Sequence, residues 1–396
     1  MDSVFAELGF DYSMDARWGD RVDRDRNLSN MAVVAEGWTR PARRLLFRSI
    51  RIEKWAQMQT VEHWAGAEVR DLDISTAGWS RVKTEKVASA VFKLLKNVPN
   101  LRRLRLGGRP LHPFNPVDSA SLQSTVFLPH LYDLQLDSVY SSQPIIFDLL
   151  ATSNHGITRL CAHSFSEPTS PLPGRQSLDF RGNLRYLSTS GAFYQTMLDP
   201  TLVAHDGLGG LEELKLWNST AVETIQREGG LIRTIAPTLR TLTIGSKKAA
   251  WLTDFPTPLS SLTRLEIAHN YEAIPLPFFR RLPPALASLH FTVDGDFHAG
   301  FALWTATPAL LPQSLKSIGF SIIYNITTFT QLPRVDTLQT TCSDSTVDHL
   351  RQLTPGTLPF TTLKMRFSGF DRPSELNSVK AECQRLGLVF SWDRDR

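Results

Sequence analysis

The stretch Leu101–Leu106, which reads LRRLRL, carries the pattern that decides the fold, because the chain repeats it many times. Leu131–Leu136 reads LYDLQL, Leu211–Leu216 reads LEELKL and Leu262–Ile267 reads LTRLEI. Each copy has aliphatic residues in its first, fourth and sixth places. Further copies, some of them weaker, begin at residues 69, 157, 184, 239, 286, 315, 335 and 360.

The copies begin 20–32 residues apart, which centres on the period of leucine-rich repeats, about 20–29 residues. In a strand the fourth and sixth residues of a copy point the same way, into a core. One repeat cannot bury its apolar face alone, whereas stacked repeats share a continuous core. The sequence therefore predicts an α/β fold, an irregular leucine-rich-repeat solenoid. This is a ribonuclease-inhibitor-like horseshoe with a parallel sheet on its concave face. The alternative, unrelated core strands in an ordinary α/β domain, fits the narrow period poorly.

Composition excludes several classes of protein. Of the 396 residues 42% are hydrophobic and 21% charged, which is ordinary for a globular chain. The 43 basic and 39 acidic residues leave a dispersed net charge of +4, which does not indicate a nucleic-acid partner. No apolar run reaches the about 18–20 residues of a membrane span, and the first thirty residues lack a signal core. We therefore expect a cytoplasmic or nuclear protein with no membrane partner.

The repeats are flanked by different sequence at both ends. Ser374–Leu386 has helical spacing and stops at Gly387, and Leu388–Trp392 follows as a last strand. Solenoids need such end units to cover their cores. Inside the array, Thr84–Asn97 and Thr346–Leu353 are expected helices. We expect a helical segment over 1–52 with an irregular start, a solenoid over 53–373, and a capping helix and strand over 374–396.

The segment Asn27–Ile52 reads NLSNMAVVAEGWTRPARRLLFRSIRI. An apolar helix face leads to Trp38, Pro41 lies in the first turn of a second helix, and LLF ends that helix before an alternating strand. This resembles the second half of an F-box, as found in fungal F-box proteins with leucine-rich repeats. The opening Leu-Pro pair of that family has no counterpart here, because no proline precedes Pro41.

The resemblance implies the substrate receptor of a cullin–RING (SCF-type) ubiquitin ligase, in which the F-box docks on a Skp-type adaptor and the repeats hold a target protein. The positions that it assigns to adaptor docking or to the F-box core are Leu28, Met31, Val34, Trp38, Leu45, Leu46 and Phe47. One alternative remains open at this point. The same residues fit a helical cap over the first repeat, and the chain is then a stand-alone repeat scaffold or recognition protein.

Signatures of enzymes are absent, so we expect a non-catalytic protein with no cofactor and no metal. The sequence has no GxGxxG, GxxxxGK[ST], HExxH or GxSxG motif. Asp294–His298 is a compact acid/His cluster that fits a solvated turn better than a cation site or a hydrolase. Cys161 and His163, with His155 nearby, fit a surface Cys beside a His better than zinc, which takes four ligands. The three cysteines are far apart and form no disulfide framework.

Strand alternation predicts which residues face a partner. If the repeat leucines point into the core, the residues between them point to the concave wall, where charges alternate in bands and aromatic side chains add contact area. The predicted partner-binding residues are Arg103, Arg105, Asp133, Gln135, Arg159, His163, Tyr186, Glu213, Lys215, Trp217, Arg264 and Glu266. An alternative for the charged bands is that they pair with one another across the sheet. Trp217 is expected to contact a partner or to cover the edge of its repeat.

Overall fold

The computed structural model describes residues 48–64, 66–76, 79, 82, 84–108, 128–137, 156–163, 178–189, 203–217, 234–245, 259–270, 276–293, 312–320, 334–341, 344–367 and 373–394. The chain forms two compact units, one over Met1–Ile157 with Arg396 and one over Thr158–Asp395. The elements of the first unit are β1 (Ser49–Ile52), α4 (Trp55–Trp64), β2 (Asp71–Ser75), α5 (Thr84–Lys96), β3 (Arg103–Gly107) and β4 (Asp133–Asp137).

The second unit holds the remaining described elements, most of them strands. They are β5 (Arg159–Ala162), β6 (Tyr186–Thr189), the 3₁₀ helix η1 (His205–Leu208), β7 (Glu213–Trp217), β8 (Thr241–Gly245), β9 (Arg264–Asn270), α11 (Leu276–Phe279), β10 (Ser288–Val293), β11 (Ser317–Phe320), β12 (Thr337–Thr341), α14 (Asp344–Gln352), β13 (Thr362–Phe367), α15 (Pro373–Leu386) and β14 (Val389–Arg394).

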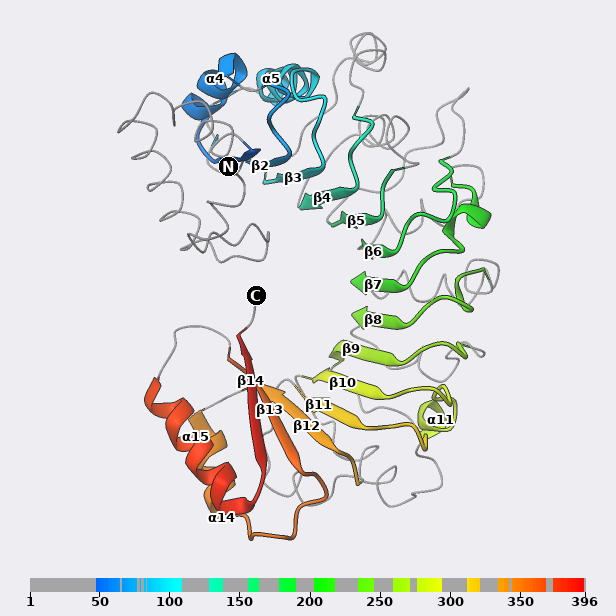
Figure 1. The fold of residues 1–396 in the computed structure, drawn as a ribbon, viewed down its shortest axis with the longest axis vertical. Coiled ribbons are helices and arrows are strands. Elements are labelled where there is room, and N and C mark those ends of the chain that lie inside the picture. Colours follow the sequence, from blue (N-terminus) through cyan, green and yellow to red (C-terminus); the bar gives the residue numbers. More distant parts are fainter. Residues whose placement is uncertain are drawn as a thin grey trace, which may run out of the picture. The chain divides into compact units, whose positions relative to one another are not determined.

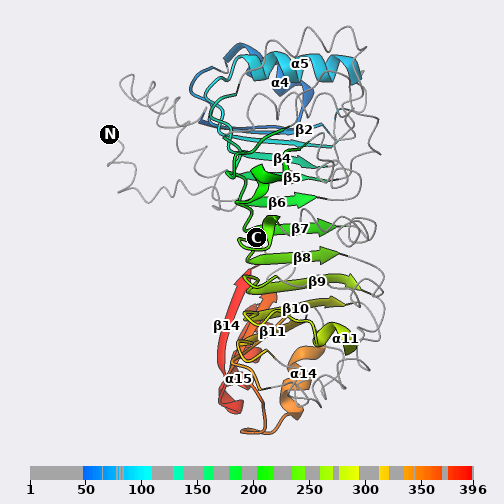
Figure 2. The ribbon, with the colours of Figure 1, turned by 90° about the vertical axis from the view of Figure 1, so that its right-hand side faces the viewer.

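Within each unit the strands pair in chain order, and every pair is parallel (Figures 1 and 2). The register aligns the repeat leucines: Leu104 lies opposite Leu134, and Leu214 lies opposite Leu242. These leucines, with the first aliphatic residue of each copy, are almost completely buried. The leucine-rich-repeat solenoid expected from the sequence is confirmed: the twelve copies form β2–β13, and β1 and β14 add a strand at either end.

A recurring hydrogen-bond arrangement fixes where most of the described repeat strands start. The Arg185 carbonyl accepts the N–H groups of two successive residues of the next repeat, Glu212 and Glu213, each at 2.9 Å. The Arg240 carbonyl does the same for Thr263 at 2.9 Å and Arg264 at 3.0 Å. Because each strand is aligned to its predecessor at its first residue, the side chains of successive strands fall into rows.

The helices lie beside the sheet and follow the sequence expectations closely where these fall on described residues. The helix expected over Thr84–Asn97 is α5, and those expected over Thr346–Leu353 and Ser374–Leu386 are α14 and α15. The helix α4 was not expected from the sequence. None of the helices that the structure describes is long and apolar enough to cross a bilayer.

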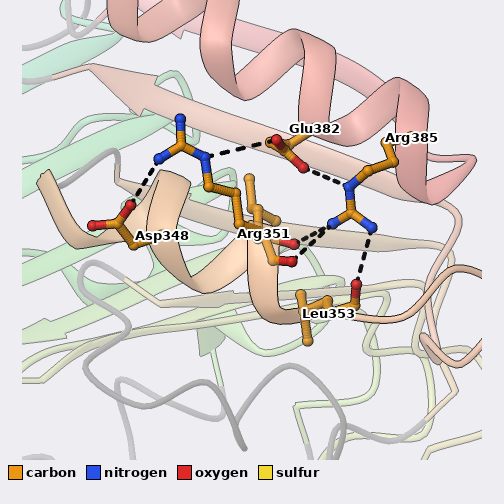
Figure 3. Close-up of polar contacts among 6 residues, drawn as sticks. Asp348, Arg351, Leu353, Glu382 and Arg385 are labelled. Atoms are coloured by element: carbon orange, nitrogen blue, oxygen red, sulfur yellow. Dashed lines mark hydrogen bonds and ion pairs between the residues drawn. The ribbon is translucent and has the colours of Figure 1, made fainter.

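One arginine ties the C-terminal helix to its neighbour (Figure 3). Arg385 of α15 donates from Nη2 to the Leu350 carbonyl at 2.7 Å and from Nη1 to the Leu353 carbonyl at 3.1 Å. Its Nε also lies 2.6 Å from Glu382 Oε2. A cation at the carbonyl end of α14 adds a donor to the last carbonyls of the helix and complements the helix dipole. The expected capping helix is therefore fastened to the last turn of α14.

Candidate protein-binding surface

Each sheet has a core face, where the repeat leucines lie, and an opposite side that we call the open face. On β7, burial alternates along the strand: Leu214 and Leu216 are buried, whereas Glu213, Lys215 and Trp217 are partly exposed. Of the predicted contact residues all but one lie within strands, at positions that alternate with the core residues. The exception, His163, follows β5 directly. The structure places them in two groups, one in each unit.

In the first unit the charged residues of the open face pair with one another. Arg103 Nε lies 3.3 Å from Asp71 Oδ1 on the neighbouring strand, and Arg51 Nε lies 3.7 Å from Asp73 Oδ2. Gln135 Nε2 donates to Asp133 Oδ1 at 3.3 Å. These contacts match the alternative in which alternating charges stabilise the sheet itself. Arg105 lies in the same open-face register, opposite Asp73 and Gln135.

In the second unit the open face carries an aromatic and cationic group on β5–β7. The Arg159 guanidinium lies 4.1 Å from the centre of the Tyr186 ring, and Lys215 Nζ lies 5.4 Å from the same centre. Both distances are within the range of cation–π attraction. Lys215 Nζ also lies 3.1 Å from Glu213 Oε1. The two cations therefore hold the Tyr186 ring in one position.

Trp217 is seated against the sheet by two contacts. Its Nε1 donates to Ser188 Oγ at 3.2 Å, and Ser188 Oγ also lies 3.2 Å from His163 Nε2, at hydrogen-bond distance. A Cβ placed on Gly245 of the next strand would come within 3.1 Å of the Trp217 ring. The indole thus lies over a position that has no side chain. We call Arg159, His163, Tyr186, Ser188, Lys215 and Trp217 the open-face cluster.

Burial and charge set the protonation of the cluster. Burial, with a contribution from Cys161, raises the pKa of Tyr186 above its ordinary value. Burial alone lowers the pKa of Lys215, but its contacts with Tyr186 and Glu213 outweigh this, so the net change is a raised pKa. At neutral pH the surface accordingly presents a neutral phenol beside a charged ammonium group.

Further along the open face the side chains are mostly small and polar. Arg264 Nη2 lies 3.7 Å from Glu266 Oε2 on the same strand, so this predicted pair is also an ion pair within the sheet. The buried His290 ring occupies the space above Gly319, where any added Cβ would overlap it. Among the described strands of the second unit, the open-face cluster is thus where aromatic area and charge lie together on the open face.

The sequence interpretation needs one correction at Cys161. We expected a surface thiol, but Cys161 is only 8% exposed, since Tyr186 and Ser188 of the next strand lie beside it. The described residues contain no group of three or more side chains that would hold a metal ion. His155, the Asp294–His298 cluster and all seven F-box-like positions lie outside the described residues: Leu28, Met31, Val34, Trp38, Leu45, Leu46 and Phe47.

The comparisons with known proteins yield structural matches only. No protein-family model and no curated protein matches the chain. Among solved structures 61 chains match. One, from a crystal structure described as the Rad7 and Elc1 complex in yeast, is 14% identical, covers 92% of this chain and 87% of its own, and has a TM-score of 0.39. The repeat pattern and the strand register show that the fold is a leucine-rich-repeat solenoid.

Proposed function

We propose that this chain is a non-catalytic protein-binding repeat protein that serves as the substrate-recognition subunit of a cullin–RING (SCF-type) ubiquitin ligase. Its target contacts the open face of the second unit around the open-face cluster. The observation that carries the binding role is this cluster, in which Tyr186 and Trp217 are held in fixed positions on a parallel sheet.

The physical support comes from the residue types that are enriched in protein–protein interfaces. Tryptophan, tyrosine and arginine dominate binding hot spots, because large rigid side chains bury area at a small cost in conformational entropy. Trp217 has its indole N–H bonded and its ring over Gly245, so part of that entropy is already lost in the free protein. By contrast, the charged residues Arg103 and Asp71 of the first unit form an ion pair with each other. We therefore place target contact on the second unit.

The ligase role is supported by the resemblance of residues 27–52 to the second half of an F-box. In this proposal the LLF sequence at Leu45–Phe47 contributes apolar contact to a Skp-type adaptor. Transfer of ubiquitin is the task of partner subunits, which agrees with the absence of catalytic motifs from the sequence.

Adaptor docking is tested by co-purifying the full chain with a Skp-type adaptor. We expect the wild-type chain to bind and Leu46→Asp to lose binding, because a carboxylate in an apolar contact carries a large desolvation penalty. Arg48→Ala is the matched control, since Arg48 is exposed and adjacent. No association of the wild type would remove the ligase role and leave a stand-alone recognition protein.

Target contact is tested separately, by comparing the proteins that co-purify with wild type, Trp217→Ala and Lys380→Ala. We expect Trp217→Ala to lose a set of partners that the Lys380 variant keeps, because Lys380 is exposed on the helix α15 and is not part of the open-face cluster. Identical sets for all three proteins would contradict a binding role for the open-face cluster.

A further inference from the structure

A row of three arginines lies at the strand starts of the first unit. Arg48, Arg70 and Arg102 directly precede β1, β2 and β3, and the register sets them on neighbouring strands. The Arg70 N–H donates to the Arg48 carbonyl at 2.9 Å, and the Arg102 N–H donates to the Arg70 carbonyl at 2.7 Å. We call these three residues the arginine row. It shares no residue with the open-face cluster or with the seven F-box-like positions.

The side chains of the arginine row are accessible to solvent. Arg48 and Arg102 are exposed and Arg70 is partly exposed. Arg70 Nη1 donates to the Asn100 carbonyl at 3.1 Å. In the part of the chain that the structure describes, none of the three forms an ion pair with a carboxylate. The row therefore presents positive charge that no bound carboxylate neutralises there.

The equivalent positions of the second unit alternate in charge. Arg185, Glu212 and Arg240 directly precede β6, β7 and β8, and the same type of backbone bond joins them. Arg185 Nη1 lies 3.3 Å from Glu212 Oε1. Opposite charges on neighbouring strands stabilise a sheet, whereas like charges destabilise it. The arginine row is therefore unfavourable for folding alone, and a bound anion would remove its repulsion.

The spacing of the row sets the size of the anion. Neighbouring strands lie about 4.8 Å apart, so the backbone positions of the row span about 10 Å. In an extended peptide every second side chain points the same way, at intervals of about 6.6 Å. Two or three carboxylates at alternate positions of such a peptide match the row. Guanidinium groups suit carboxylates because their planar fork donates two hydrogen bonds at once.

A long polyanion such as nucleic acid fits this surface less well. The next position of the row, directly before β4, is Tyr132, so the run of arginines stops there. The adjoining open face mixes arginines with aspartates, as in the ion pair of Arg103 with Asp71. It does not continue a surface of one sign along which a phosphate backbone would lie. The surface therefore favours a ligand whose negative charge is confined to a short length.

We propose that the arginine row binds a short acidic segment of a partner protein. Two or three carboxylates at alternate positions of this segment pair with Arg48, Arg70 and Arg102, and the segment lies across the starts of β1, β2 and β3. This contact is separate from the target contact on the second unit and from adaptor docking.

Fluorescence polarisation of the full chain tests the proposal at low ionic strength, about 50 mM NaCl. The probes are a labelled six-residue peptide of alternating glutamate and serine, the same peptide with glutamine for glutamate, and a labelled hexathymidylate. We expect the glutamate peptide to bind, the glutamine peptide not to bind, and hexathymidylate to bind more weakly than the glutamate peptide. The proposal is overturned if the glutamate peptide does not bind at up to about 1 mM, or if either other probe binds as tightly.

A matched pair of charge reversals locates the binding site. Arg102→Glu and Arg240→Glu replace exposed residues at the same position of a repeat and lower the net charge equally. Arg102→Glu should raise the Kd of the glutamate peptide by about tenfold or more, and Arg240→Glu should change it by less than about twofold. Equal effects of the two variants would show attraction to the net charge alone and would overturn the proposal.

Unfolding curves separate a binding role from a structural one. Arg102→Ala should be at least as stable as the wild type, because it removes a like charge from the row. A clear loss of stability would contradict the proposal, since it would show that the Arg102 side chain holds the sheet together.

The proposed function and this inference can fail separately. Arg48→Ala should weaken the glutamate peptide by about two- to fivefold while it keeps the Skp-type adaptor. Peptide binding that is unchanged in Arg48→Ala would remove Arg48 from the row and overturn the proposal in this form. The peptide assay needs neither adaptor nor target, so its result leaves the ligase role untouched.

Discussion

Gly210 lies so close to the preceding repeat that no side chain fits there. A Cβ at this position would overlap the carbonyl oxygen of Gly182, a residue that itself has a φ of +71°. We therefore expect Gly210→Ala to lower the free energy of unfolding by about 1–3 kcal/mol, because the turn must shift to accept the methyl group.

Chemical denaturation measures this loss against a glycine that has room. Gly66 has nothing within 4 Å of an added Cβ and no positive φ, so Gly66→Ala should change stability little. If the two variants lose similar amounts of free energy of unfolding, the close approach of Gly210 to Gly182 does not restrict the side chain at position 210.

Cys383 combines complete burial with a strongly shifted acidity. Burial, with the neighbouring Glu382 carboxylate adding to it, raises the pKa of its thiol to about 12. Thiol reagents attack the thiolate. We expect iodoacetamide at about pH 8 to leave Cys383 unmodified in the folded chain and to alkylate it after unfolding, as read by peptide mass mapping. Alkylation of the folded chain at the unfolded rate would contradict this.

The same shift makes stability depend on alkaline pH. The folded-state pKa of Cys383 lies above its ordinary value of 9.0, so the unfolded chain loses this proton first. Its contribution to the free energy of unfolding is complete below pH 9 and is lost as the pH rises towards 12. Cys383→Ala should show a smaller alkaline loss than the wild type when the two are unfolded in parallel.

For single residues, the sequence predicts the face of the sheet on which a side chain lies better than it predicts the neighbours that the side chain contacts. Alternation places Arg159, Tyr186 and Lys215 on one face, and the register agrees. It does not predict that Trp217 lies over Gly245, because that contact depends on the residue one repeat later having no side chain. It also missed the burial of Cys161, which the neighbouring strand covers.

Among the elements, the pair α14 and α15 depends on Arg385. Replacing Arg385 by alanine leaves the Leu350 and Leu353 carbonyls without this donor. Since the guanidinium is partly exposed, we expect a loss of about 1–2 kcal/mol and faster hydrogen exchange in the last turn of α14. Arg385→Lys should recover only part of the stability that the alanine variant loses, because an ammonium group lacks the planar fork that reaches both carbonyls.

Lys380→Ala on the same helix is the control for that measurement, since Lys380 is exposed on α15. Equal exchange rates in the last turn of α14 for the Arg385 and Lys380 variants would show that the arginine does not hold the two helices together.

Elements were predictable where the apolar spacing is regular. The spacing of α5 and α15 located both helices within a residue of their observed starts. The helix α4 has a weaker pattern, because WAQMQTVEHW lacks a continuous apolar face, and it was missed. The clamp by Arg385 was invisible in sequence, since its acceptors are backbone carbonyls about one repeat away.

On the scale of the whole molecule, each described strand bonds only to its neighbours in the sheet. The destabilising effect of a core substitution should therefore stay close to the substituted strand. We expect Leu265→Ala on β9 to cost about 2–5 kcal/mol, because Leu265 is fully buried in the shared core. Hydrogen exchange should rise in β8–β10 and far less in β13 and β14. Arg264→Ala on the open face is the control. Uniform exchange across the second unit would contradict a one-dimensional solenoid.

The solenoid itself was predictable because the same spacing recurs many times along the chain. A weak copy of the motif could be identified because it lies at the spacing that the strong copies define. What surrounds the strands was less predictable, since each connection differs in length and composition. The candidate partner surface was only partly predictable. Its face follows from alternation, but its centre on β5–β7 depends on which cations and rings meet across the register.

The carbonyl that accepts two N–H groups at the start of most described strands has a consequence for how such a chain changes over evolution. Because this bond aligns a strand by its first residue, as at Arg185 and Arg240, the length of the preceding connection does not enter the alignment. Insertions and deletions can then accumulate between strands, as the 20–32-residue intervals illustrate, while the rows of side chains keep their order. Homologous chains can therefore differ in the length of their connecting loops while the alignment of the strands is kept.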